Sequence, residues 1–177
     1  MLIDVSFFTS GPRHIQNASS TGMPSPESMA VNESIEGYIE AFQGEFLYSA
    51  VGKDLAVALA DHLRLVEDEE TGNDSEGRSK DMDLSGFDIV CRKLQESFAD
   101  YVFYHILRDS NTQATMTGLV RLKCANEYMV PMERQVDVWN GMVNKNRRFV
   151  EWAMTDECPY KVEIEKNLLT PINVLNL

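Results

Sequence analysis

The stretch that decides the fold covers residues 32–63 and reads NESIEGYIEAFQGEFLYSAVGKDLAVALADHL. Its first half carries apolar residues at steps of four, three and four, which place them on one face of a helix. These residues are Ile35, Ile39, Phe42 and Phe46. Leu55, Leu59 and Leu63 form a second stripe, and Gly52 lies between the stripes, where a helix C-terminus favours a left-handed residue. The stretch predicts one helix that starts after Asn32 and a second over residues 53–66.

A third helix is expected over residues 86–108. Ser85 and Asp88 form a short capping box, and Leu84 and Ile89 can pack across it as a hydrophobic staple. The apolar stripe that follows is long enough to lie at the centre of a core. Its members are Val90, Leu94, Phe98, Tyr101, Val102 and Leu107.

A fourth helix is expected from Pro131, because proline is favoured in the first turn of a helix. Its stripe consists of Val136, Trp139, Val143, Phe149 or Val150, and Ala153. Before it, TMTGLVRLK at residues 115–123 is typical of a short strand or an extended segment. The chain therefore predicts a mainly α fold, a small bundle of about four helices with room for a strand or hairpin.

Two arms are expected to flank this bundle. Residues 1–32 form an extended N-terminal arm, residues 33–157 the helical domain, and residues 158–177 a C-terminal arm. Both arms are unusually apolar, and the N-terminal arm is expected to pack on its own domain or on a neighbour. The C-terminal arm is expected to seek a partner surface, with strand addition around Val162 and Ile164 as one way to pair with a neighbour. Within the domain, residues 67–83 hold eight acids and two bases and predict a solvated loop.

The net charge of −12 is concentrated in the first half of the chain. Residues 1–85 hold 16 acids and 5 bases, and residues 86–177 hold 12 acids and 11 bases. This acidic balance argues against direct nucleic-acid binding, which calls for a basic footprint. The sequence has no apolar run long enough for a membrane span and no basic leader before its short apolar N-terminal patch, so we expect a cytoplasmic protein.

No catalytic, cofactor-binding or metal-binding constellation is recognised in the sequence. The three cysteines, Cys91, Cys124 and Cys158, are far apart and are expected to be reduced and buried. His62 is expected at the polar edge of its helix, and the acidic loop lacks the calcium-loop spacing. Tyr101, Phe103, Tyr104, Trp139 and Trp152 are expected in the core rather than around a ligand.

One basic patch lies on the fourth helix. It consists of Lys145, Asn146, Arg147 and Arg148. It is small and has no interleaved aromatic residues on its face, unlike a nucleic-acid site. We expect it to meet acidic surface, in this chain or in the next copy.

Two blocks of the sequence resemble small proteins encoded between the capsid and tail genes of tailed bacteriophages and prophages. Residues 38–59, YIEAFQGEFLYSAVGKDLAVAL, are similar to that family's YI-x-x-[YF]-E-x-EFL-x-x-x-LG-x-x-L signature. Residues 101–146 are similar to its second block, in which a Tyr-rich helix end and a Gly-containing stretch precede an N-x-x-x-V-x-P entry and a W-N-x-M-V helix. The matching residues of the second block are Asn126, Val130, Pro131, Trp139, Asn140, Met142 and Val143. Gln43, where the pattern often has an acid, and the long acidic loop depart from it.

The resemblance implies a head–tail connector, also called an adaptor or head-completion protein, which joins the portal at the capsid vertex to the tail. It implies a helical protein without catalytic residues or cofactors, assembled as a ring through which DNA passes without specific binding. The implied partners are portal and tail-side virion proteins and further copies of the chain, in the virion and in the host cytoplasm during assembly. Candidate interface residues are Phe7, Phe8, Val162, Ile164, Leu168, Leu169, Ile172 and Leu175 in the arms, with Arg147 and Arg148.

An acidic intracellular binding module, for example a nucleic-acid mimic that occupies a basic partner, is the alternative. It calls for acids in rows on rigid helices, whereas the densest acids here lie in the expected loop at residues 67–83. A small enzyme is a third reading, which needs His105, Cys124 or carboxylates converging in one pocket.

Overall fold

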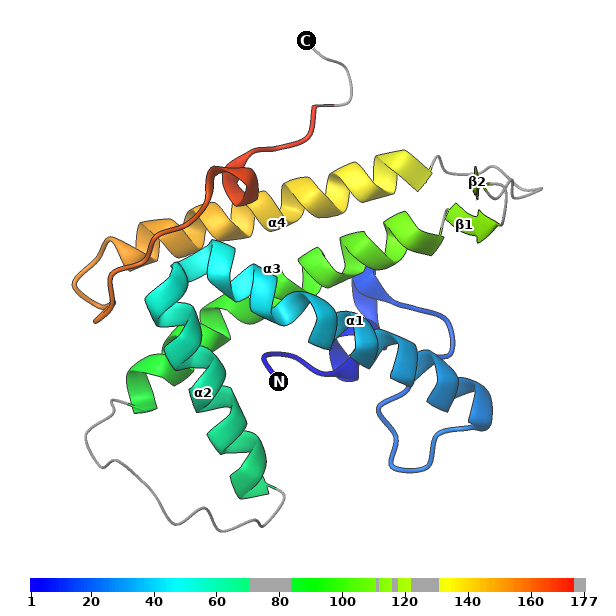
Figure 1. The fold of residues 1–177 in the computed structure, drawn as a ribbon, viewed down its shortest axis with the longest axis horizontal. Helices are drawn as coiled ribbons and strands as arrows, with labels where there is room; N and C mark the ends of the chain where they lie inside the picture. The colour runs from blue at the N-terminus through cyan, green and yellow to red at the C-terminus, as the bar shows by residue number, and fades with distance from the viewer. Residues whose placement is uncertain (71–83, 111, 116–117, 122–130, 174–177) are drawn as a thin grey trace.

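The computed structural model describes residues 1–70, 84–110, 112–115, 118–121 and 131–173 (Figure 1). Four α-helices dominate these residues, which confirms the predicted mainly α bundle. They are α1 (Pro26–Val51), α2 (Lys53–Glu70), α3 (Leu84–Ser110) and α4 (Pro131–Ala153). The arms add the 3-10 turns η1 (Val5–Phe8), η2 (Gly11–Arg13) and η3 (Lys166–Leu169).

A two-stranded antiparallel hairpin lies between α3 and α4 in the chain, as the sequence allowed. Its strands are β1 (Thr112–Thr115) and β2 (Gly118–Arg121), and Gln113 pairs with Val120. The predicted extended stretch at residues 115–123 contains β2. The hairpin joins two helices that run side by side in opposite directions (Figure 1).

The predicted start of the first helix at Asn32 is wrong, and with it the boundary of the N-terminal arm. Helix α1 begins at Pro26, and the hydroxyl of Ser25 accepts a hydrogen bond from the backbone N–H of Ser28 at 3.2 Å. Asn32 lies inside α1, where its side-chain amide bonds both the N–H and the carbonyl of Ser19. Pro26 lies within the segment expected to be an extended arm, yet proline suits the first helical position because its missing N–H has no partner there.

The predicted break at Gly52 is confirmed. Gly52 has φ 86°, a backbone conformation that favours glycine, and its N–H donates to the carbonyl of Tyr48. A Cβ at this position would lie 3.2 Å from the Cβ of Glu163 in the C-terminal arm. Gly52 therefore serves both the turn between α1 and α2 and the close approach of the arm.

Two other helix boundaries differ from prediction. Helix α2 continues to Glu70, so residues 67–70 of the expected acidic loop are helical, and residues 71–83 lie outside the described chain. Helix α3 starts at Leu84, so Ser85 is already a helical residue rather than the residue before the helix. The apolar period marks the body of a helix better than its ends.

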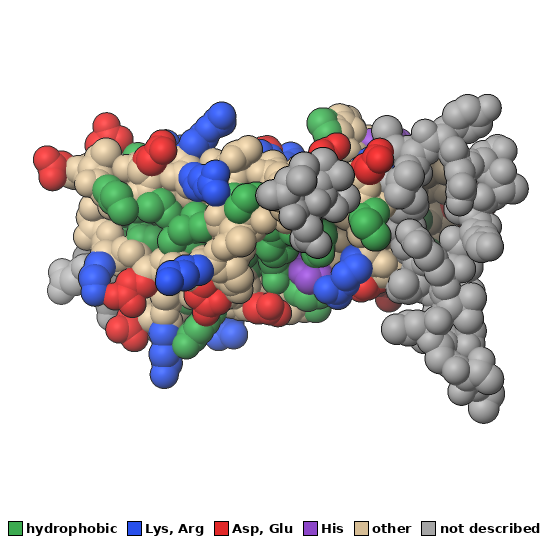
Figure 2. Space-filling view, turned by 90° about the horizontal axis from the view of Figure 1, so that it is seen from above, with side chains coloured by type: hydrophobic (Ala, Val, Ile, Leu, Met, Phe, Trp, Pro, Cys, Tyr) green, Lys and Arg blue, Asp and Glu red, His purple; other side chains and the backbone are tan. Residues whose placement is uncertain are grey.

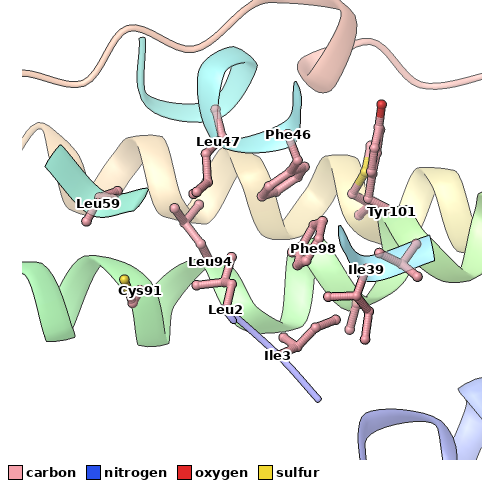
Figure 3. Close-up of a cluster of buried hydrophobic side chains, with 14 of the residues drawn as sticks. Leu2, Ile3, Ile39, Phe46, Leu47, Leu59, Cys91, Leu94, Phe98 and Tyr101 are labelled. Atoms are coloured by element: carbon pink, nitrogen blue, oxygen red, sulfur yellow. The ribbon is translucent and has the colours of Figure 1, made fainter. Parts of the chain in front are cut away.

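The core lies where α3 packs against both α1 and α4. The predicted stripe of α3 is confirmed: Val90, Leu94, Phe98 and Val102 are fully buried. Ile39, Phe46 and Leu59 meet this stripe from α1 and α2, and Figure 3 shows Leu2 and Ile3 of the N-terminal arm pointing among them. The N-terminal arm therefore packs on its own domain, one of the two predicted alternatives.

The expectation that His62 lies at a polar edge is wrong. The residue is only 3% exposed, and its Nε2 lies 2.8 Å from Oδ1 of Asp88 on α3. A histidine next to a leucine stripe is drawn into the interface between α2 and α3 because Asp88 offers a hydrogen-bond partner there.

Candidate functional surface: the arms and their seats

The N-terminal arm is fixed to α3 and α4 by a group of four charged side chains. Arg13 bonds Asp100 and Glu96 on α3, with N···O distances of 2.8 Å to each carboxylate. Nζ of Lys145 on α4 lies 2.5 Å from Oδ2 of Asp100. Burial opposes the charge of Glu96, but its bonds to Arg13 and the charge of Lys145 outweigh it and hold the pKa of Glu96 below its usual value. The prediction that the basic patch meets acidic surface is confirmed for Lys145.

The C-terminal arm turns back after α4, and its residues 160–173 return along that helix (Figure 1). Side chains of α4 bond the backbone of four arm residues, Leu168, Leu169, Thr170 and Ile172. Asn140 does so twice: its Oδ1 accepts from the N–H of Ile172 at 2.8 Å and its Nδ2 donates to the same residue's carbonyl at 3.1 Å. Trp139 donates from Nε1 to the carbonyl of Thr170 at 3.0 Å. We call these α4 side chains, with Asn146 and Arg147, the α4 seat.

Asn146 is the buried member of the α4 seat. It is 0% exposed, accepts a hydrogen bond from the hydroxyl of Ser97, and donates to the carbonyl of Leu168 at 2.9 Å. Arg147 donates to the carbonyl of Leu169 at 3.2 Å. Sequence reasoning placed Asn146 in a basic patch and missed this role. An amide within the apolar stripe formed by Val143 and Phe149 was the available signal.

The first part of the C-terminal arm covers the end of α1. The backbone N–H groups of Glu163 and Glu165 donate to the carbonyls of Val51 and Ser49, at 3.3 and 2.8 Å. Carbonyls in the last turn of a helix lack partners within the helix, so the arm satisfies two of them. One edge of the extended segment predicted for strand addition, around Val162 and Ile164, is thus bonded within the chain.

The predicted interface residues divide by burial. Phe8 and Leu168 are buried in the chain's own core, at 0% and 2% exposure, so neither is free to meet a partner in this arrangement. Three further members, Phe7, Val162 and Ile164, are half-buried and pack against the core. Leu169 is half-buried as well. Ile172, Arg147 and Arg148 are exposed and stay candidates, while Leu175 lies outside the described residues.

The face of the molecule seen from above carries both signs of charge. Figure 2 shows Lys and Arg side chains interspersed with Asp and Glu around exposed apolar side chains. Affinity for nucleic acid grows with the number of phosphates that basic side chains neutralise. The visible part of this face shows no area in which only basic side chains gather.

An aromatic cluster joins α1, α3 and α4. Phe42 stacks on His105 with ring centroids 4.0 Å apart, and Tyr101 meets both rings edge-on. His105 is 7% exposed, and neither ring nitrogen has a hydrogen-bond partner among the described residues. Burial, with the nearby charge of Arg108, lowers the pKa of His105 to about 4. The expected core role is confirmed for Tyr101 and Phe103, whereas Tyr104, Trp139 and Trp152 are half-buried.

The cysteines show no reactive setting among the described residues. Cys91 is buried, and desolvation raises the pKa of its thiol to about 11; Cys158 is half-buried and its thiol donates to the carbonyl of Tyr160. Cys124 lies outside the described chain, as does any meeting of it with His105. In the described part of the chain, no three His, Cys, Asp or Glu side chains are grouped as a metal site would need.

A search of the described helices for a membrane span found none that is both long and apolar enough. Comparison of the chain with protein-family models, with curated proteins and with solved structures found no match.

Proposed function

We propose that this protein is a structural component of a tailed-phage virion, a head–tail connector that assembles as a ring between the portal and the tail. The proposal starts from the two sequence blocks that resemble this family. The observation that supports it most is that aromatic residues of both blocks pack together in one cluster. The ring centroids of Phe42 in the first block and Tyr101 in the second lie 5.9 Å apart.

Polar contacts join the same two blocks. The hydroxyl of Tyr38 donates to Asp109 and that of Tyr101 donates to Glu45, each at 3.1 Å. Within the second block, the ring centroid of Tyr101 lies 6.3 Å from that of Trp139, the tryptophan of the W-N-x-M-V motif. If the two blocks resembled the family by chance, they would not be expected to contact each other. If they form one structural unit, such contacts are expected.

The arms supply the means of assembly in this proposal. The N-terminal arm is held by polar contacts to α3 and α4, and the C-terminal arm by polar contacts to α4 and to the end of α1. Arg147 of the α4 seat, the adjacent Arg148, and Ile172 of the arm are exposed. Acidic surface suits a channel for DNA, because a duplex is repelled by it and does not stick. We expect residues 67–83 to face that channel or bulk solvent.

Deletion of the gene from the phage or prophage that encodes it tests the proposal. The expected result is DNA-containing heads and free tails that fail to join, with joining restored when the purified protein is added to the lysate. Electron microscopy of the isolated heads should then show an added ring at one vertex. Intact infectious virions without the protein would refute the connector role.

One observation supports the alternative function, an acidic module that binds a basic partner. Helix α1 carries Glu27, Glu33, Glu36, Glu40 and Glu45, all exposed, and no Lys or Arg. These acids lie on a rigid helix, as a nucleic-acid mimic requires. Salt-sensitive binding of the intact protein to a basic DNA-binding protein from the same host, lost when Glu33, Glu36 and Glu40 are replaced by Gln, would favour this function.

A further inference from the structure

The α4 seat recognises the backbone of the C-terminal arm rather than its particular side chains. Asn140, Trp139, Asn146 and Arg147 all bond peptide N–H or carbonyl groups of residues 168–172. Leu168 alone among those five residues is buried. The seat therefore binds a peptide segment through its backbone and one apolar anchor, and the chain fills its own seat.

The connection between α4 and the arm is exposed and held only by local bonds. Met154 is 81% exposed, and Thr155, Asp156 and Glu157 are exposed as well. The backbone bonds here are local: the N–H of Thr155 donates to the carbonyl of Trp152, and the N–H of Cys158 donates to that of Thr155. This turn reverses the chain, and its conformation decides whether the arm lies on its own α4.

We propose that the arm exchanges between copies, so that residues 160–173 of one chain occupy the α4 seat and the end of α1 of a neighbouring chain. The inference rests on the proposed function in that it specifies how ring subunits join. Every bond of the arm is the same in the closed and exchanged forms, because the seat is identical in each copy. A chain whose arm passes to the next copy forms a heterologous interface, which closes into a ring when the rotation allows.

Concentration decides between the two forms. A flexible connection of this length gives the arm an effective concentration of about 1 mM at its own seat. At a protein concentration of about 10 µM the closed form should therefore win by roughly 100-fold. A connection too short to fold back removes that advantage and leaves the seat to the arm of another copy.

The test uses a variant that lacks residues 155–157, with a matched control that has three Gly or Ser residues inserted at the same place. We expect the unaltered chain and the control to elute as monomers at about 10 µM, and the shortened variant to form dimers or rings with unchanged helical circular dichroism. Unlabelled and ¹⁵N-labelled shortened chains are unfolded together, refolded and treated with an amine-reactive cross-linker. Lys166 in the arm and Lys145 beside the seat should then join in mixed-isotope pairs.

Two results overturn the exchange. One is a shortened variant that stays monomeric, whether folded with its arm displaced or closed. The other is an assembly in which Lys145–Lys166 pairs never mix isotopes. To guard against a deletion that fails to fold, the unaltered chain is mixed in the same way at 1 mM, where about half of the seats should be exchanged. An absence of mixed pairs there overturns the proposal too, while the virion experiment reports separately on the connector role.

Discussion

Protonation of His105 should set how the stability of this protein depends on acid. The imidazole lies between Phe42 on α1 and Tyr101 and Tyr104 on its own helix, with Trp139 of α4 packed against Tyr101 and Tyr104. The charged groups that act on it are Arg108 and Asp109 on α3 and Glu45 on α1. Burial and Arg108 favour the neutral ring, and they outweigh the two acids.

The sign follows from comparing the folded and unfolded states. The pKa of His105 is lowered to about 4 in the folded state, against about 6.5 for an unperturbed histidine. Below pH 6.5 the unfolded chain therefore binds a proton that the folded chain resists, and stability falls until the pH passes below 4. At pH 4.5 this one residue should cost about 2 to 3 kcal/mol relative to pH 7.5.

Urea unfolding of the wild-type protein and of His105→Phe at pH 7.5 and pH 4.5 measures this difference. Phenylalanine keeps the stack on Phe42 and cannot be protonated, so the variant should lose about 2 to 3 kcal/mol less than wild type on acidification. Carboxylates titrate equally in both proteins and cancel. Exposed His14 supplies the control, because His14→Gln should follow the wild type. Equal acid losses in wild type and His105→Phe would refute the reasoning, and His105→Leu guards against a phenylalanine that does not fit.

Three further substitutions test the seats of the arms. Gly52→Ala should destabilise the chain by about 2 kcal/mol in urea unfolding, because φ is 86° and the new Cβ meets Glu163; a neutral result would show that the arm shifts freely. Asp100→Asn should cost about 2 kcal/mol and speed proteolysis near Arg13, because two cations lose their shared carboxylate, whereas Asp137→Asn on the exposed face should not. Leu168→Ala should cost about 3 kcal/mol and Leu169→Ala much less; similar losses would contradict the anchor role of Leu168.

The helix stripes could be predicted from the sequence because they depend only on the period of the helix. Phe46, Phe98 and Val143 were assigned to the core without knowledge of their partners, and each is buried. The break at Gly52 was predictable for a similar reason, since the glycine conformation is a local property. The helix ends were predicted less well: α1 starts before Asn32, α2 continues past Val66, and α3 already includes Ser85.

The seats of the arms could not be predicted, since they depend on which helices lie side by side. Asn140 and Asn146 look alike in the sequence, yet one holds an exposed backbone segment and the other is fully buried against Ser97. His62 and His105 are both buried, but only His62 has Asp88 within hydrogen-bond distance. The spacing of residues in a sequence predicts on which face of its own helix a side chain lies. It does not predict which polar group of another helix lies opposite that side chain.

The two arms are held in different ways, and this difference favours the C-terminal arm as the one that moves. The N-terminal arm buries Leu2, Ile3, Val5 and Phe8 in the main core, so its release exposes four apolar side chains at once. At about 1.5 to 3 kcal/mol for each, that release costs as much as unfolding a typical domain. The C-terminal arm fully buries one side chain, Leu168, and its Tyr160, Val162 and Ile164 lie half-buried against the core. Five hydrogen bonds from α4 add about 1 kcal/mol net each, so release of this arm alone also costs several kcal/mol. The arm lies on the surface of the helices, however, so the main core stays closed when it leaves, and every one of its contacts and bonds forms again on a neighbouring copy.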